Sequence, residues 1–155
     1  MKEAVVAGAI AVAAFNAVAG LMGAWLWYRG DPVVERGARA FWVMLRLAQG
    51  SALAYAIAVG SLAATGHYAS EKLFYLYALL PLAVGFVAEQ LRVASAQTIL
   101  DLRGLEGSEA VAALPEPEQH ELVASIVRRE IGVMALSALV VVFLALRAAG
   151  TAHGF

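Results

Sequence analysis

The chain has 155 residues, of which 62% are hydrophobic and 15% are charged. A soluble domain is usually about half apolar and about a quarter charged, so the composition indicates a membrane protein. The net charge of −1 gives no support for nucleic-acid binding, and the absence of cysteine excludes disulfides, thiolate metal sites and cysteine nucleophiles.

The first long apolar stretch covers residues 4–28. A cleavable signal peptide has an apolar core of about 7–15 residues, and this stretch is longer. It ends in aromatic residues followed by a base, namely Trp25, Trp27, Tyr28 and Arg29. Such an ending is typical of a membrane interface, so we expect a retained first transmembrane helix here.

Three further stretches are apolar and long enough to cross a bilayer core of about 30 Å, which takes roughly 20 residues. They cover residues 40–64, 70–92 and 129–148. Together with the first stretch they predict a single transmembrane domain over residues 1–155. The expected fold class is therefore an all-α integral membrane protein with a four-helix bundle.

The segment 93–128, between the last two spans, is predicted to form a cytoplasmic helical hairpin. Helix three has no breaker before Gly104, and helix four is expected to begin at Pro117 with acidic residues in its first turn. A helix from Pro117 to Arg147 would be about 45 Å long, which exceeds the hydrocarbon thickness. We expect its apolar stripe to pack on the extension of helix three, through Leu122, Val123, Ile126, Val127 and Val133.

The distribution of basic residues predicts the orientation, because cytoplasmic loops carry an excess of lysine and arginine. One side of the predicted bundle receives eight arginines: Arg29, Arg36, Arg39, Arg46, Arg92, Arg103, Arg128 and Arg129. The other side receives three basic residues: Lys2, Lys72 and Arg147. We therefore expect a multi-pass protein of the cell membrane with both termini outside the cytoplasm.

Polar side chains of three helices fall near the cytoplasmic boundary of the predicted bundle. This polar belt comprises Arg46, Gln49, Glu89, Gln90, Arg92, Arg128, Arg129 and Glu130. Since an unpaired ion in lipid costs several kcal/mol, we expect Glu89 to pair with Arg46 or Arg92. For the same reason we expect Glu130 to pair with Arg128 or Arg129.

Two interpretations of the belt stay open. It could bind an anion or a lipid headgroup, or hold a proton-linked carboxylate at Glu89. Alternatively, it is a ring of snorkelling side chains that anchors the bundle, which its peripheral depth favours. Arg46 with Gln49 is the strongest single candidate for function in the belt.

Small and polar residues deeper in the first two helices predict close helix packing. The residues are Asn16, Gly20, Gly23 and Ala24 on one face of the first helix, and Ser51 with Tyr55 in the second. A small-residue face lets helices approach, and Asn16 could then form a hydrogen bond across the contact. A permeation or ligand site is the alternative.

No cofactor, metal site or enzyme motif is expected. The three histidines lie in loops or near helix ends, which disfavours haem, and no phosphate-binding glycine loop, HExxH or GxSxG occurs. The bilayer itself is the first expected partner. Self-assembly or a larger membrane complex is expected next, with anionic lipid as a further possible ligand.

Three functional hypotheses follow. The first is a non-enzymatic assembly or accessory subunit that docks partners through the hairpin, whose acidic residues are Glu106, Glu109, Glu116, Glu118 and Glu121. The second is a small oligomeric transporter or channel that uses Arg46, Gln49, Glu89 and Arg92 as its polar path. The third and weakest is an enzyme acting on a lipid headgroup at the same belt.

Overall fold

The computed structural model describes residues 1–30, 35–105 and 107–153; Glu106 and the side chain of Arg36 lie outside the described part. The described residues form five α-helices: α1 (Lys2–Arg29), α2 (Glu35–Ala64), α3 (Lys72–Leu102), α4 (Gly107–Ala112) and α5 (Glu116–Thr151). No strand occurs among the described residues. The predicted all-α class is therefore confirmed.

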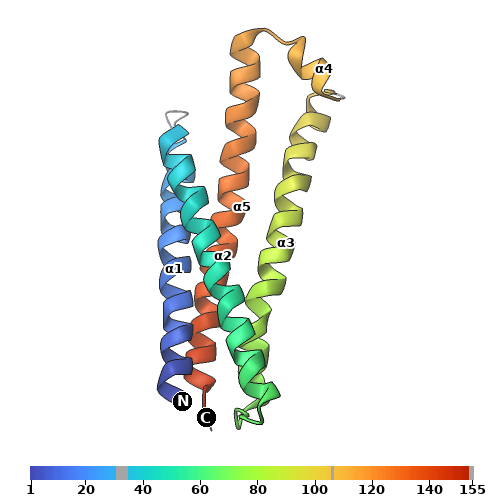
Figure 1. Cartoon of the computed structure of the whole chain (residues 1–155). Helices are drawn as coiled ribbons and strands as arrows, with labels where there is room; N and C mark the ends of the chain where they lie inside the picture. The colour runs from blue at the N-terminus through green and yellow to red at the C-terminus, as the bar shows by residue number, and fades with distance from the viewer. Residues whose placement is uncertain (31–34, 106, 154–155) are drawn as a thin grey trace.

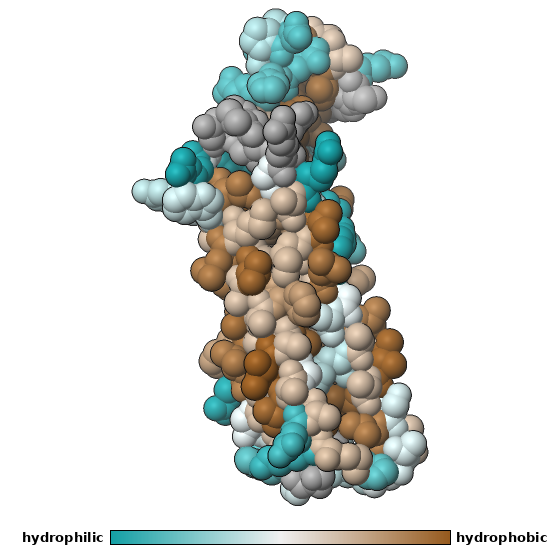
Figure 2. All heavy atoms as spheres, turned by 60° about the vertical axis from the view of Figure 1, so that its left-hand side comes forward, coloured by the Kyte–Doolittle hydropathy of each residue, from teal (hydrophilic) through white to brown (hydrophobic). Residues whose placement is uncertain are grey.

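Four of these helices are long and apolar enough to cross a membrane: α1, α3, α5 and the part of α2 that begins at Gly37. This agrees with the four apolar helices predicted from the sequence. Figure 2 shows hydrophobic residues over the middle of one face and hydrophilic residues gathered at its two ends. A surface of this kind suits a hydrocarbon layer between two polar layers.

Helix α5 is the centre of the arrangement. It packs most extensively on α1 and next on α3, whereas α2 packs mainly on α1 and touches α3 less. Both termini and the turn between α2 and α3 lie at one end of the molecule, and α4 lies at the other (Figure 1). Toward α4, the helices α3 and α5 diverge (Figure 1).

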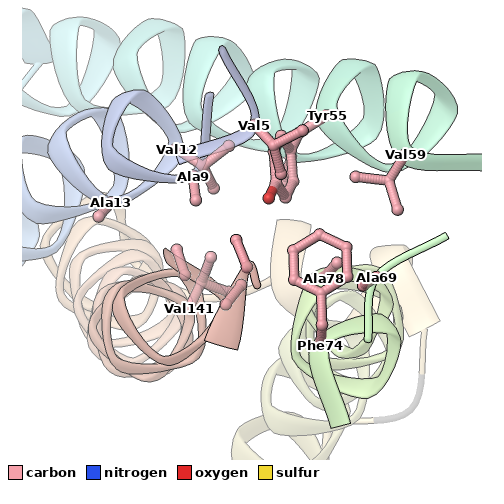
Figure 3. Close-up of a cluster of buried hydrophobic side chains, with 14 residues drawn as sticks. Val5, Ala9, Val12, Ala13, Tyr55, Val59, Ala69, Phe74, Ala78 and Val141 are labelled. Carbon is pink, nitrogen blue, oxygen red and sulfur yellow. The ribbon is translucent and has the colours of Figure 1, made fainter. Parts of the chain in front are cut away.

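Two clusters of buried apolar side chains hold the four long helices together. The cluster nearer the termini draws on all four helices and includes Val12, Tyr55, Phe74 and Val141 (Figure 3). The second cluster includes Ala19, Phe41, Leu45, Ala88 and Met134. The core therefore runs along the bundle and leaves large apolar side chains on the outside as well.

Two glycines of α1 lie in tight contact with the neighbouring helices. A Cβ atom at Gly20 would lie 2.7 Å from Cδ2 of Leu139 on α5. At Gly23 it would lie 2.5 Å from Cε2 of Phe41 on α2 and 2.7 Å from Cβ of Ala135 on α5. The face carrying Gly20 and Gly23 thus contacts both α2 and α5, because glycine has no Cβ atom and leaves room for the neighbouring helices.

The hairpin is formed by the far end of α3, the short helix α4 and the first turns of α5. Helix α3 ends at Leu102, and Gly104 follows with a positive φ of 66° that suits a residue without Cβ. The side-chain amide of Gln119 donates to the carbonyl oxygens of Ala112 at 3.3 Å and Leu114 at 2.8 Å. These bonds tie the end of α4 to the start of α5.

The expected apolar stripe of the hairpin needs a correction. Leu122 is buried, but Val123 is 54% exposed. Val123 and Val127 line a groove toward α1 and α2, and Val127 also packs against the second core cluster. The reason is geometric: adjacent residues point about 100° apart around a helix, so Leu122 and Val123 cannot share one partner.

Candidate functional site

Four polar side chains join α2 to α3 at the level of the second core cluster. On α2, Arg46 Nη1 donates to Oε1 of Gln49 at 2.6 Å and to Oε1 of Glu89 on α3 at 2.6 Å. Gln49 Nε2 donates to the same carboxylate oxygen of Glu89 at 3.2 Å. We name Arg46, Gln49, Glu89 and Arg92 the polar clamp.

Arg92 holds the other oxygen of the clamp carboxylate. Its Nε lies 3.1 Å from Oε2 of Glu89, at ion-pair distance but without the alignment of a hydrogen bond. The guanidinium of Arg92 also lies over the ring of Trp42 on α2, 5.2 Å from its centroid. The expectation that Glu89 pairs with Arg46 or Arg92 is thus met by both arginines.

Local helix geometry explains the clamp. Residues three apart share a helix face, so Arg46 points with Gln49 and Glu89 points with Arg92. The side chains are 55% exposed for Arg46, 26% for Glu89 and 28% for Arg92. Since α2 and α3 otherwise touch little here, the clamp is the main polar link between them.

The rest of the predicted belt does not join the clamp. Gln90 and Arg129 are exposed. Arg128 Nε donates to the carbonyl oxygen of Trp27 at 3.1 Å, with its guanidinium 5.8 Å from the centroid of that indole ring. Arg128 therefore anchors the end of α1 on α5.

The expected pairing of Glu130 with Arg128 or Arg129 is wrong. The salt bridges among the described residues do not include Glu130. Residues one or two apart in a helix do not face each other, which explains why neither arginine reaches it.

A crevice of about 270 Å³ lies beside the clamp, between α2, α3 and α5. Its polar lining consists of Asn16, Gln49, Glu89 and Ser137, with Pro81 and Gly85 on the α3 side. Asn16 is buried, and its Nδ2 donates to the carbonyl oxygens of Val12 on its own helix at 2.9 Å and Ala48 on α2 at 3.5 Å. The expected hydrogen bond from Asn16 across a helix contact is present.

The other residues expected to pack helices behave differently from one another. Ser51 Oγ donates to the carbonyl oxygen of Ala48 on its own helix at 2.7 Å and so bridges no helices. Tyr55 is buried and points from α2 into the core cluster nearer the termini (Figure 3), but its hydroxyl has no hydrogen-bond partner. A Cβ at Gly8 would lie 2.9 Å from the Tyr55 ring, and Ala24 is half-buried.

A larger groove of about 920 Å³ opens between α1, α2 and the first half of α5. Its walls are mostly apolar and include Leu26, Trp27, Trp42, Val43, Leu47 and Ile131. Basic side chains also line it: Arg39, Arg46, His120 and Arg128. Sequence reasoning missed this groove and its residues Arg39, Trp27 and Trp42, because it depends on which helices pack together.

No three His, Asp or Glu side chains of the described residues gather in a way that could hold a metal ion. The clamp and the groove supply guanidinium, amide and carboxylate groups beside apolar walls.

Comparison with protein-family models, with curated proteins and with solved structures finds no match to the chain.

Proposed function

We propose that the protein is a non-enzymatic, multi-pass protein of the cell membrane that docks a partner protein through its helical hairpin. In this proposal both termini lie outside the cytoplasm and the hairpin lies inside it. The observation that carries the proposal is the length of α5. Its 36 residues make a helix of about 54 Å, well beyond the roughly 30 Å of a hydrocarbon core.

The surface of the hairpin supports docking to a basic protein. Its acidic side chains Glu109, Glu116 and Glu118 are exposed. Leu102, at the end of α3, is 79% exposed and supplies an apolar contact on the same hairpin. Exposed acids and an exposed leucine on one hairpin suit a partner that offers both basic and apolar groups.

A photo-crosslinking experiment in cells tests this proposal. A photoreactive residue at Leu102 is expected to give one discrete crosslinked product, and the same residue at Leu73, at the opposite end of α3, is expected to give none. Changing Glu109, Glu116 and Glu118 together to glutamine should abolish the product at Leu102. Glu121 is left intact because it lies 3.7 Å from Arg103 of α3 and helps to close the hairpin.

The matched control neutralises acids at the other end of the molecule. Glu3 and Glu71 are exposed, and changing both to glutamine should leave the Leu102 product unchanged. The triple glutamine variant should still fold, because each charge near a helix start contributes only about 0.3–1 kcal/mol. The proposal is contradicted if the Leu102 product persists in the triple glutamine variant. It is also contradicted if changing Glu3 and Glu71 to glutamine reduces that product as much as the triple change does.

A second candidate function is transport, and the crevice is the observation that favours it. Asn16, Gln49 and Glu89 line one space within a bundle of spanning length. In proteoliposomes loaded with a pH-sensitive dye, transport predicts proton flux that Glu89→Gln abolishes and Arg129→Gln leaves unchanged. Equal flux with and without the protein, for protons, potassium and chloride alike, counts against this candidate.

A further inference from the structure

The groove between α1, α2 and α5 combines apolar walls with an excess of positive charge. Its volume of about 920 Å³ lies at the upper end of the roughly 300–1,000 Å³ of typical ligand sites. Arg39, Arg46, Arg128 and His120 line it, and no acidic side chain does so among the described residues. An occupant that complements this lining is long, apolar and negatively charged at one end.

Two of these arginines have unused capacity for an anion. Arg46 is held by Glu89 in the polar clamp. Arg128 uses its Nε on the carbonyl oxygen of Trp27, and its two terminal nitrogens form no hydrogen bond with a described residue. Arg39 forms no ion pair with a described residue. The planar guanidinium group binds phosphate through paired hydrogen bonds, which suits Arg39 and Arg128 to a phosphate ligand.

The depth of Arg39 and Arg128 along their helices favours a lipid over a soluble anion as the ligand. At ~1.5 Å per residue, Arg39 lies about 37 Å along α2 from its end at Ala64. On the same scale, Arg128 lies about 34 Å along α5 from its end at Thr151. Both values exceed a hydrocarbon core of about 30 Å but fall within the roughly 40–45 Å of a whole bilayer, where phosphates lie.

The walls continue from that level toward the core. Trp27 and Trp42 are amphipathic rings of the kind found at membrane interfaces. Val43 and Leu47 follow Arg39 along α2 and are more than half exposed, whereas Ile131, which follows Arg128 along α5, is buried. An acyl chain attached to a phosphate at Arg39 and Arg128 would therefore run over apolar side chains.

We propose that the groove binds an anionic phospholipid of the leaflet next to the hairpin, with its phosphate on Arg39 and Arg128 and an acyl chain along Val43 and Leu47. The inference rests on the bilayer placement proposed above and is independent of any protein partner. An exposed apolar surface between helices is covered by lipid in a membrane, and the guanidiniums of Arg39 and Arg128, which form no ion pair with a described residue, favour an anionic lipid.

Native mass spectrometry of the detergent-solubilised protein tests the inference. The probes are phosphatidylglycerol and phosphatidylcholine with identical acyl chains, titrated separately. The intact protein should bind one phosphatidylglycerol in preference to phosphatidylcholine. Arg39→Gln with Arg128→Gln should weaken phosphatidylglycerol binding about tenfold or more, because charge-assisted hydrogen bonds to phosphate are lost.

A matched control and a steric variant sharpen the test. Arg129→Gln removes the same charge one residue further along α5, outside the groove, and should leave binding unchanged. Ala124→Trp keeps every charge but fills the groove one turn before Arg128, and should also weaken binding. A helical circular dichroism spectrum like that of the unchanged protein confirms that each variant is folded.

Three results overturn the inference: equal binding of the two lipids, loss of binding in Arg129→Gln as large as in the double variant, or unchanged binding in Ala124→Trp. Extraction of cell membranes with alkaline carbonate separates this failure from failure of the bilayer placement. A protein that stays in the membrane pellet but shows no lipid preference overturns only the lipid site.

Discussion

Glycine-to-alanine substitutions should change stability in opposite directions according to the space at each position. In a helix interior, alanine is favoured over glycine by roughly 0.5–1 kcal/mol. At Gly50 a Cβ would meet no atom within 4 Å, so Gly50→Ala should gain this amount. At Gly23 the Cβ would lie 2.7 Å from Cβ of Ala135, which moves only with its backbone, and 2.5 Å from the ring of buried Phe41.

Overpacking of this kind costs about 1–3 kcal/mol, so Gly23→Ala should lose about 1–2 kcal/mol overall. Gly20→Ala should fall between the two, because its nearest neighbour is the flexible end of the Leu139 side chain at 2.7 Å. Unfolding in mixed micelles, followed by helical circular dichroism, measures the three free energies of unfolding. Gly23→Ala as stable as Gly50→Ala would refute the close approach of α1 to α2 and α5.

Three further predictions test the clamp and the buried polar groups. Glu89→Gln should destabilise the protein by about 1 kcal/mol. A double-mutant cycle with Arg46→Gln should give a coupling free energy of about 0.5–1 kcal/mol, because the pair is partly exposed. Additive effects of the two substitutions would show that the ion pair contributes nothing to stability. Tyr55→Phe should raise the free energy of unfolding by about 1 kcal/mol, because the buried hydroxyl lacks a partner; a loss on the same unfolding curve would show that the hydroxyl is bonded. Asn16→Ala should cost about 0.6 kcal/mol, the typical value for a hydrogen bond between membrane helices; a cost of several kcal/mol would contradict that modest role.

Hydropathy and helix-breaking residues were sufficient to predict the helices. Apolar runs of spanning length, Gly104 and Pro117 gave the number of long helices and the approximate limits of the hairpin. The common depth of Arg46, Gln49, Glu89 and Arg92 near one end of the predicted bundle also indicated that these groups could meet. Features that depend on one helix alone were therefore accessible from the sequence.

Features that depend on the rotation and neighbours of each helix were not accessible. The side chain of Trp27 lies against Gly132, where a Cβ would be 2.9 Å from the indole ring, yet no local pattern links these residues. The groove exists because α2 packs on α1 and leaves α5 partly uncovered. The error at Val123 has the same origin, since a rotation of about 100° decides which neighbour a side chain meets.

The measurement that tests the central claim most directly is labelling of single cysteines in intact cells. The chain has no cysteine, so Glu3→Cys near the N-terminus and Glu109→Cys in α4 can each be probed with a membrane-impermeant maleimide without background. A bundle with external termini and a cytoplasmic hairpin predicts labelling of Glu3→Cys in intact cells and of Glu109→Cys only after lysis. Labelling of Glu109→Cys in intact cells would contradict the proposed orientation and, with it, docking of a cytoplasmic partner.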